Sequence, residues 1–106
     1  MTIHTVFWRK PNATFVDGLS AYDDMFSGAP QEFLDSLTSV DANLLSSGVI
    51  NAAETYSWNQ TTSRLTITRD INDMPAFLLA RDSVRDAYMS IAESNGWIRV
   101  KSVEDN

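Results

Sequence analysis

The sequence predicts an α+β fold, in which a four-stranded antiparallel sheet carries helices on one face in the order β-α-β-β-α-β. Three observations lead to this prediction. Runs of β-branched and aromatic residues lie near both ends of the 106-residue chain, two further runs flank a short polar turn, and apolar residues recur at helical spacing in the intervals between. Because the sequence contains neither a repeat nor a low-complexity linker, residues 1–106 are expected to form a single ferredoxin-like domain.

The first predicted strand covers residues 3–9, and Pro11 ends it. Alternate side chains of a strand point to opposite faces. The two rows are His4, Val6 and Trp8 on one face, and Ile3, Thr5 and Phe7 on the other. Because both rows carry large apolar groups, we expect a central strand that is covered on two sides, and either row could meet the helices.

Two helices are expected before Gly48. Residues 14–26 show helical spacing and a capping-box pattern at Thr14 and Asp17, although part of this segment could be loop. A second helix begins near Pro30 and ends at Gly48, a residue typical of a helix C-terminus. The two apolar stripes are Phe15, Leu19, Tyr22 and Phe26, followed by Phe33, Leu37, Val40 and Leu44.

A hairpin is expected from two strands, residues 49–59 and 64–71, joined by a turn over residues 60–63. The favoured register sets Trp58 opposite Leu65, Tyr56 opposite Ile67 and Glu54 opposite Arg69. The register shifted by one residue sets Tyr56 against Thr66 and Glu54 against Thr68. We prefer the first, because it gains aromatic–aliphatic pairs and an ion pair.

A long helix is expected over residues 73–95, with Asp73 as its N-cap and Pro75 in its first turn. A second capping-box pattern at Ser83 and Asp86 predicts a kink near residues 81–83. The last strand covers residues 97–103. The expected core, where the helices meet the sheet, includes Phe33, Leu37, Val84, Tyr88 and Ile98.

Helices on one face leave the other side of the sheet open. That side would present Trp97, Arg99 and Lys101, together with an apolar row of the first strand. Because tryptophan-bearing strands are poorly suited to contact with water, we expect a symmetric homodimer formed through this face.

The element order, the first strand Thr-Val-Phe-Trp-Arg and the broken last helix Asp-Met-Pro-Ala-Phe-Leu-Leu-Ala-Arg-Asp-Ser-Val resemble the dimeric α+β barrel superfamily of ferredoxin-like proteins. This group includes antibiotic-biosynthesis-monooxygenase-type domains and small dimeric ferredoxin-like proteins. The resemblance covers nearly the whole chain, although about 40 residues between the first two strands is long for the group. It implies a dimeric α+β barrel. Its members include cofactor-free oxygenases, haem-degrading enzymes and isomerases, so it does not imply one reaction.

Five residues are candidates for ligand contacts: His4, Trp8, Glu54, Tyr56 and Arg69. His4 is the only histidine and could act as a base or an axial ligand, or be a strand histidine that is partly exposed to water or bonded to a backbone carbonyl. Three of the others share one face of the hairpin, where they could orient a planar, oxygen-bearing ligand or form part of the core. No catalytic residue is assigned, and the pair Asp23-Asp24 is interpreted as a solvated helix face.

Composition excludes several classes. The chain has no cysteine, so no disulfide or thiol-ligated metal is expected. A net charge of -6 without a basic run disfavours nucleic acid and anionic membrane partners. No Walker loop, Gly-x-Ser-x-Gly elbow or dinucleotide fingerprint is present, so no cofactor or metal is expected. Without a leader or an apolar span of about 20 residues, a cytoplasmic location is expected.

Two functions are consistent with these observations. The first is a small-molecule-binding domain for an aromatic or carbonyl metabolite, which could extend to cofactor-free oxygenase or isomerase activity. The alternative is a non-enzymatic structural or interaction module that works as a homodimer.

Overall fold

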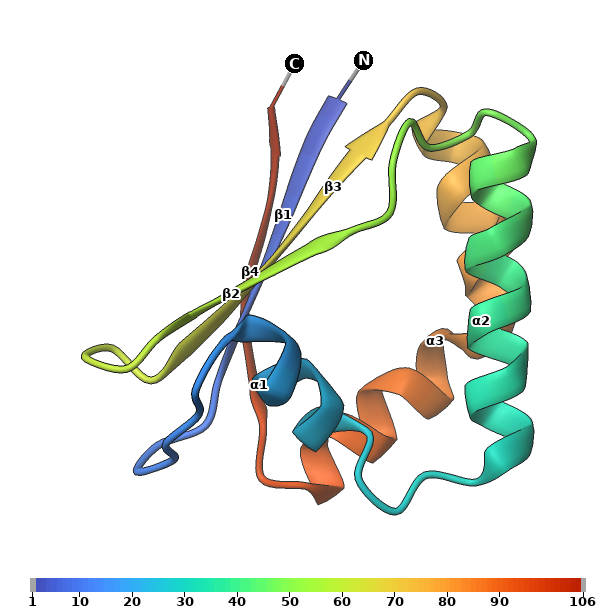
Figure 1. The fold of residues 1–106 in the computed structure, drawn as a ribbon. Helices are drawn as coiled ribbons and strands as arrows, with labels where there is room; N and C mark the ends of the chain where they lie inside the picture. Colours follow the sequence, from blue (N-terminus) through green and yellow to red (C-terminus); the bar gives the residue numbers. More distant parts are fainter. Residues whose placement is uncertain (1, 106) are drawn as a thin grey trace.

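The computed structural model describes the backbone of residues 2–105 and the side chains of residues 2–100, and this part of the chain forms seven elements (Figure 1). They are β1 (Thr2–Arg9), α1 (Gly18–Met25), α2 (Gln31–Ser46), β2 (Thr55–Asn59), β3 (Arg64–Ile71), α3 (Met74–Ser94) and β4 (Ile98–Asp105). The α+β class and the four-stranded antiparallel sheet are confirmed. Two helices rather than one separate β1 from β2, so the order is not strictly β-α-β-β-α-β. Over residues 2–105, no helix is both long and apolar enough to cross a membrane.

The strand order in the sheet is β2-β3-β1-β4, and each neighbouring pair is antiparallel. β1 is therefore central, as predicted. In the hairpin, Trp58 pairs with Leu65 and Tyr56 with Ile67, which confirms the preferred register.

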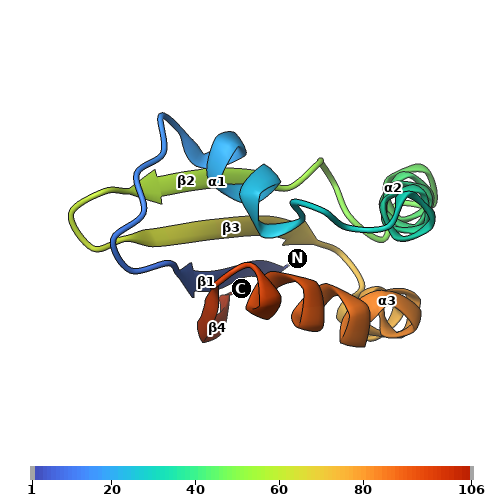
Figure 2. The ribbon, with the colours of Figure 1, turned by 90° about the horizontal axis from the view of Figure 1, so that it is seen from below.

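The helices cover one face of the sheet. Figure 2 shows α1 over β2 and β3, and the second half of α3 over β1 and β4. The side chains on the covered face are His4, Val6 and Trp8 of β1, and Leu65, Ile67, Arg69 and Ile71 of β3. The other row of β1 faces away from the helices, so β1 is not covered on two sides by the described chain.

The two longer helices largely follow their sequence signals. α2 starts directly after Pro30 and ends shortly before Gly48, which has a φ of 79°. α3 is capped by Asp73, whose Oδ1 accepts a hydrogen bond from the backbone N–H of Ala76 at 3.1 Å. Figures 1 and 2 both show α3 changing direction partway along, in agreement with the predicted kink. Its first half packs on α2, and its second half packs on the sheet.

The first helix differs from the prediction in both its start and its buried face. Its N-cap is Asp17 rather than Thr14, with Oδ1 accepting from the backbone N–H of Ser20 at 2.8 Å. Leu19, expected in the apolar stripe, is 56% exposed, whereas Gly18 is buried. The reason is a close approach of backbones: a Cβ atom on Gly18 would lie 2.3 Å from the carbonyl carbon of Tyr56.

Trp97 and Arg99 also lie on the face opposite to the one predicted. Trp97 is 2% exposed, and its Nε1 donates to Oδ2 of Asp24 at 3.1 Å. Arg99 stands over the ring of Trp8 on the helix side, 5.5 Å from its centroid. Ile98 faces outward instead and is 52% exposed, so its predicted core position is wrong. The side chains of successive strand residues point to opposite faces of the sheet. Placing Trp97 under the helices therefore moves Arg99 to the same face and turns Ile98 outward. The side chain of Lys101, predicted on that face, lies outside those described.

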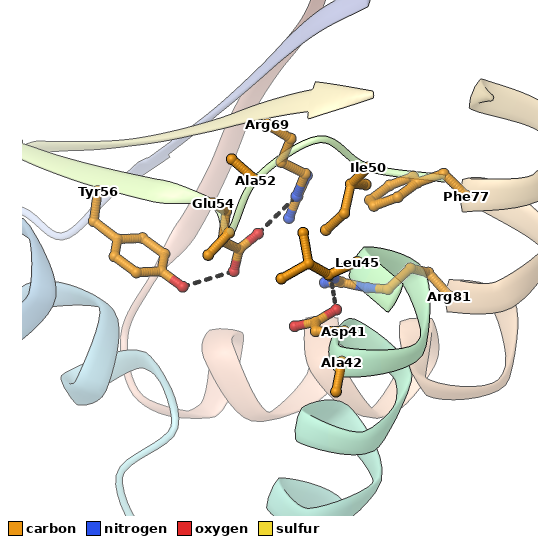
Figure 3. A pocket seen from close by; sticks show the side chains of 11 residues that line it. Asp41, Ala42, Leu45, Ile50, Ala52, Glu54, Tyr56, Arg69, Phe77 and Arg81 are labelled. Carbon is orange, nitrogen blue, oxygen red and sulfur yellow. Dashed lines mark hydrogen bonds and ion pairs between the residues drawn. The ribbon is translucent and has the colours of Figure 1, made fainter. Parts of the chain in front are cut away.

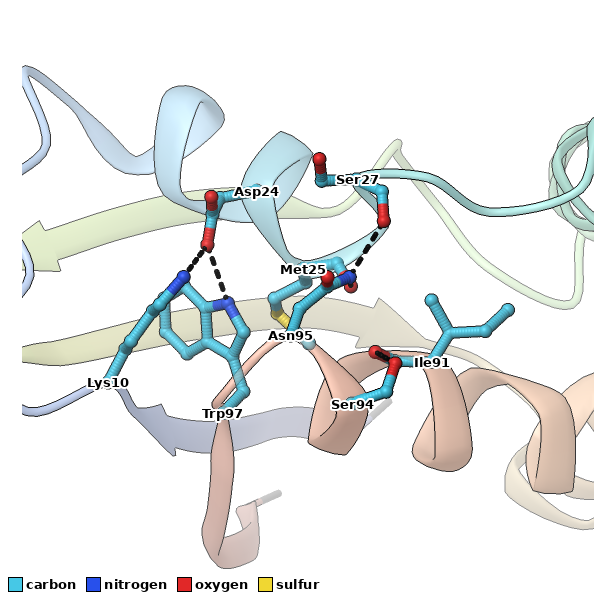
Figure 4. A network of polar contacts seen from close by, with 8 residues as sticks. All are labelled: Lys10, Asp24, Met25, Ser27, Ile91, Ser94, Asn95 and Trp97. Carbon is cyan, nitrogen blue, oxygen red and sulfur yellow. Dashed lines mark hydrogen bonds and ion pairs between the residues drawn. The ribbon is translucent and has the colours of Figure 1, made fainter.

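Asp24 links three parts of the chain, so its interpretation as a solvated helix residue is wrong. Its carboxylate accepts hydrogen bonds from Lys10 after β1 and from Trp97 before β4 (Figure 4). Nearby, the side-chain amide of Asn95 donates to the carbonyl oxygens of Met25 and Ser27. Together these contacts tie α1 to the end of α3.

We predict that Gly18→Ala destabilises the protein by about 1–3 kcal/mol, because the added methyl group cannot enter the contact with β2 without moving one of the two backbones. The sign is diagnostic, since glycine-to-alanine in an unconstrained helix stabilises by about 1 kcal/mol. Urea unfolding measures the change, with Leu19→Ala on the exposed side of α1 as a control that should cost little. A Gly18→Ala variant as stable as the wild type would contradict the close approach.

Candidate functional site

Arg69 lies at the centre of the candidate site because β3 directs it inward. Alternate residues of β3 are buried, and Arg69 falls in that row between Ile67 and Ile71. It is only 8% exposed. A buried charge without a partner costs several kcal/mol, and Arg69 is paired accordingly: its Nε donates to Oε2 of Glu54 at 2.8 Å.

Glu54 meets Arg69, as the hairpin register predicts, although the chain joins the sheet later than predicted. The expected strand over residues 49–59 is wrong in its first half, since β2 begins at Thr55. Ile50 still forms an isolated antiparallel bridge with Ile71, and Asn51 donates to Asp70 through both its backbone N–H and its side-chain amide. The chain therefore leaves β3 between Asn51 and Thr55. Glu54 therefore lies just before β2 and outside the backbone ladder, and its carboxylate forms an ion pair with Arg69.

Both oxygens of the Glu54 carboxylate are used. The hydroxyl of Tyr56 donates to Oε1 at 2.8 Å, while Arg69 occupies Oε2 (Figure 3). Burial alone would raise the pKa of Glu54, but the positive charges of Arg69 and Arg81 hold it below its ordinary value. Burial and the Glu54 carboxylate raise the pKa of Tyr56. At neutral pH the site therefore contains a carboxylate and a protonated phenol.

His4 continues this polar chain on the neighbouring strand. Its Nδ1 lies 3.3 Å from Nη1 of Arg69. Burial, with the positive charges of Arg69, Arg99 and Arg81, lowers the pKa of His4 from 6.5 to about 4. The ring is thus neutral at pH 7. Because the guanidinium can only donate, Nδ1 accepts, and the ring proton is assigned to Nε2.

A cavity of about 250 Å³ opens beside Glu54, between α2, the segment before β2 and the start of α3 (Figure 3). We call it the Glu54 cavity. It combines apolar walls with two carboxylates and two guanidinium groups. Its lining residues are Asp41, Ala42, Leu45, Ile50, Ala52, Ala53, Glu54, Tyr56, Arg69, Phe77 and Arg81.

A second cavity, of about 400 Å³, lies between the sheet and α3, and we call it the His4 cavity. Its lining residues are His4, Val6, Arg69, Phe77, Leu78, Arg81, Arg85, Tyr88, Met89 and Arg99. Arg69, Phe77 and Arg81 line both cavities and so form the wall between them. The two guanidinium carbons lie 5.4 and 5.6 Å from the centroid of the Phe77 ring.

The sequence analysis missed a second ion pair, between Arg81 Nη1 and Asp41 Oδ1 at 2.9 Å. A signal was present. Arg81 follows Phe77 by four residues and precedes Val84 by three, so it occupies a core position of α3 that the predicted stripe passed over. Asp41 likewise follows Leu37 by four residues on α2. Charged residues in an apolar stripe indicate that two helices bring opposite charges together.

Four of the five candidate residues come together, and Trp8 does not. His4, Glu54, Tyr56 and Arg69 form one continuous series of polar contacts across β1, β3 and the start of β2. Trp8 is fully buried, with its ring centroid 6.4 Å from that of Tyr88, and it lines neither cavity. Its position indicates a packing role.

Comparison with known proteins identifies no relative: no family model, curated protein or solved structure matches the chain.

We predict that His4 makes stability depend on pH. Its folded-state pKa lies below the unfolded value, so the unfolded chain binds more protons between pH 6.5 and about 4. The contribution of His4 is therefore complete above pH 6.5 and is lost as the pH falls toward 4. It amounts to about 2 kcal/mol between pH 7 and pH 5.

Chemical unfolding at both pH values measures this effect, with His4→Gln as the comparison. The carboxylates titrate in both proteins, so the wild type should lose about 2 kcal/mol more than the variant. Equal losses in the two proteins would mean that His4 keeps an ordinary pKa.

Proposed function

We propose that the chain is a small-molecule-binding domain that holds an aromatic or carbonyl compound beside Arg69. The observation that carries this proposal is the position of Arg69, a buried and ion-paired guanidinium that lines two cavities at once. Cavities of about 250 and 400 Å³ suit a ligand of about one ring.

The ion pair favours recognition of an oxygen atom on the ligand. Glu54 holds Arg69 through Nε, and Tyr56 holds Glu54, so the guanidinium plane has little freedom to turn. A guanidinium fixed in this way offers its remaining donors in a defined direction, which suits a carbonyl, phenolate or carboxylate group. Apolar side chains of the same cavities, such as Phe77 and Ile50, would contact the body of the ligand.

The protonation states favour binding over acid–base catalysis. A general base works best with a pKa near the operating pH. His4 has a pKa of about 4, Glu54 is held ionised, and the phenol of Tyr56 is held protonated. Oxygenase or isomerase activity would thus need a reactive substrate rather than a proton acceptor among these groups.

A thermal-shift screen of neutral and charged aromatic and carbonyl compounds tests the proposal. A ligand at one hundred times its Kd should stabilise the wild type by about 2.7 kcal/mol. Ala52→Leu fills the Glu54 cavity without removing a buried charge, so it should reduce the shift of a compound held in that cavity, as should Tyr56→Phe. Ala87→Leu, at an exposed alanine of α3 that lines neither cavity, is the matched control.

The outcomes separate clearly. A compound that stabilises Ala52→Leu and Ala87→Leu equally would bind somewhere other than the Glu54 cavity. If no compound in the screen shifts the wild type, the binding proposal is overturned.

A second candidate is a structural or interaction module that works as a homodimer, in the manner of a ferredoxin-like dimeric α+β barrel. The open face of the sheet favours it. The tryptophans lie under the helices, but Ile3, Ile98 and Val100 remain 38%, 52% and 41% exposed on that face. An apolar row on a two-fold axis could pair with its own copy.

Light scattering at micromolar concentration tests the assembly. A homodimer should give twice the 11.8 kDa of the chain, and Ile98→Lys should return it to the monomer mass because it would place like charges against each other across the axis. Leu79→Lys, on the exposed side of α3, is the control and should remain dimeric. A wild type of 11.8 kDa alone would rule out the dimer.

A further inference from the structure

The two cavities differ in charge although they share a wall. Within the described side chains, the Glu54 cavity is balanced, with Asp41 and Glu54 against Arg69 and Arg81. The His4 cavity has no carboxylate among its described lining residues. Its titratable lining residues, apart from the phenol of Tyr88, are all basic: His4, Arg69, Arg81, Arg85 and Arg99. This occurs in a chain whose net charge is -6, so the basic groups are concentrated locally against the overall balance.

The basic groups reach the His4 cavity from three elements. Arg69 comes from β3, Arg81 and Arg85 from α3, and Arg99 from β4. Arg69 and Arg81 each donate from one nitrogen to a carboxylate that lines the Glu54 cavity. Arg85 lies toward the surface, and its side chain is 68% exposed. Its Nη2 lies 3.4 Å from Oδ1 of Asp82 in the preceding turn, and its Nε lies 3.9 Å from Oδ1 of Asp86. A surface pair of this kind contributes little and exchanges readily for a better partner.

The rest of the cavity is apolar. Val6 forms its floor on β1, and Leu78, Met89 and the ring of Phe77 complete its walls from α3. Leu78 is 55% exposed although it is a large aliphatic residue. A ligand for this space therefore needs a hydrophobic body as well as a negative charge. A small inorganic anion has the charge but lacks the hydrophobic body.

His4 provides a further donor without adding a charge. Its Nδ1 faces Arg69, and the neutral ring carries its proton on Nε2. The groups that surround it are Arg69 from β3, Arg81 from α3 and Arg99 from β4, and the β1–β4 register sets residue 104, a glutamate, opposite His4. Burial is the main cause of the low pKa of His4, and the positive charges of these arginines lower it further. An anion that enters among the arginines would offset their part of the effect.

We infer that the His4 cavity binds the carboxylate of a small organic acid with an aromatic or branched aliphatic body. This inference rests on the proposed function and deepens it, since it assigns the charged end of the ligand to the arginines of the His4 cavity. Planar carboxylate and guanidinium groups match in geometry. Arg69 gives its Nε–H to Glu54 and Arg81 gives Nη1 to Asp41, so each of these guanidinium groups has further N–H donors to offer a ligand.

Matched carboxylate and amide pairs test this assignment. Phenylacetate and phenylacetamide share one body, as do isovalerate and isovaleramide, and the members of each pair differ in charge. Calorimetry at pH 7 should show the carboxylate binding at least about tenfold more tightly than its amide. Arg85→Gln should weaken carboxylate binding about three- to tenfold and leave amide binding unchanged. Arg9→Gln removes the same charge at an exposed residue that lines neither cavity, and it should have no such effect.

The ring of His4 gives a second, independent readout. It is the only histidine, so its imidazole signals in an NMR spectrum need no assignment. Saturating carboxylate should raise the pKa of His4, and saturating amide should not. A carboxylate that binds elsewhere would leave this titration unchanged, and that result would overturn the inference.

Failure of the inference and failure of the proposed function look different. Equal affinity for acid and amide, or equal losses in Arg85→Gln and Arg9→Gln, would overturn the anion site while leaving a small-molecule domain. If neither acid nor amide binds and the broader screen also finds no ligand, both are overturned.

Discussion

A single charge placed in the apolar row of β3 determines much of the structure around it. Arg69 is buried, so the fold must supply a carboxylate, and Glu54 does so from a segment that has not yet joined the sheet. The carboxylate then needs a second donor, which is Tyr56. Burial of its own ring, together with the same guanidinium, keeps the neighbouring His4 neutral. The carboxylate and its second donor follow from the cost of holding one cation away from water.

The molecule divides into a filled end and a hollow end. At the filled end, the ring of Phe15 packs 4.9 Å from Trp58 and 5.7 Å from Trp97, and α1 sits directly on the backbone of β2 at Gly18. At the hollow end, α2 packs against α3 and not against the sheet (Figure 1). The two cavities lie at this end. A rigid aromatic block thus supports a region in which a ligand could be held without rebuilding the core.

The sequence predicted what depends on local pattern. Asp73 and Pro75 identified the start of α3, and the polar turn determined the hairpin register. It failed where one backbone meets another, because nothing in the spacing of Leu19 and Tyr22 reveals that Gly18 presses on β2. The face of β4 was wrong for a related reason. Trp97 finds its polar partner in Asp24, far away in the chain, and no local pattern contains that contact.

The candidate site was accessible to sequence reasoning only in part. The hairpin register brought Glu54, Tyr56 and Arg69 together, since it depends on pairs of neighbouring strands. The Arg81–Asp41 pair depends on how α2 meets α3, and that packing depends on the bend in α3. The charge difference between the two cavities could not be predicted from the sequence. The arginines of the His4 cavity come from three separate elements, which only the three-dimensional structure brings together.

The geometry of β1 and β4 has a mechanical consequence. The two strands are antiparallel neighbours, and Ile3 pairs with Asp105, so residues 2 and 105 lie side by side at one end of the sheet (Figure 1). A pulling force applied at these two points would load the hydrogen bonds of the ladder one after another rather than together. The sheet would therefore peel open at low force from this end, and the His4 cavity, walled by β1, would be among the first parts to lose its shape.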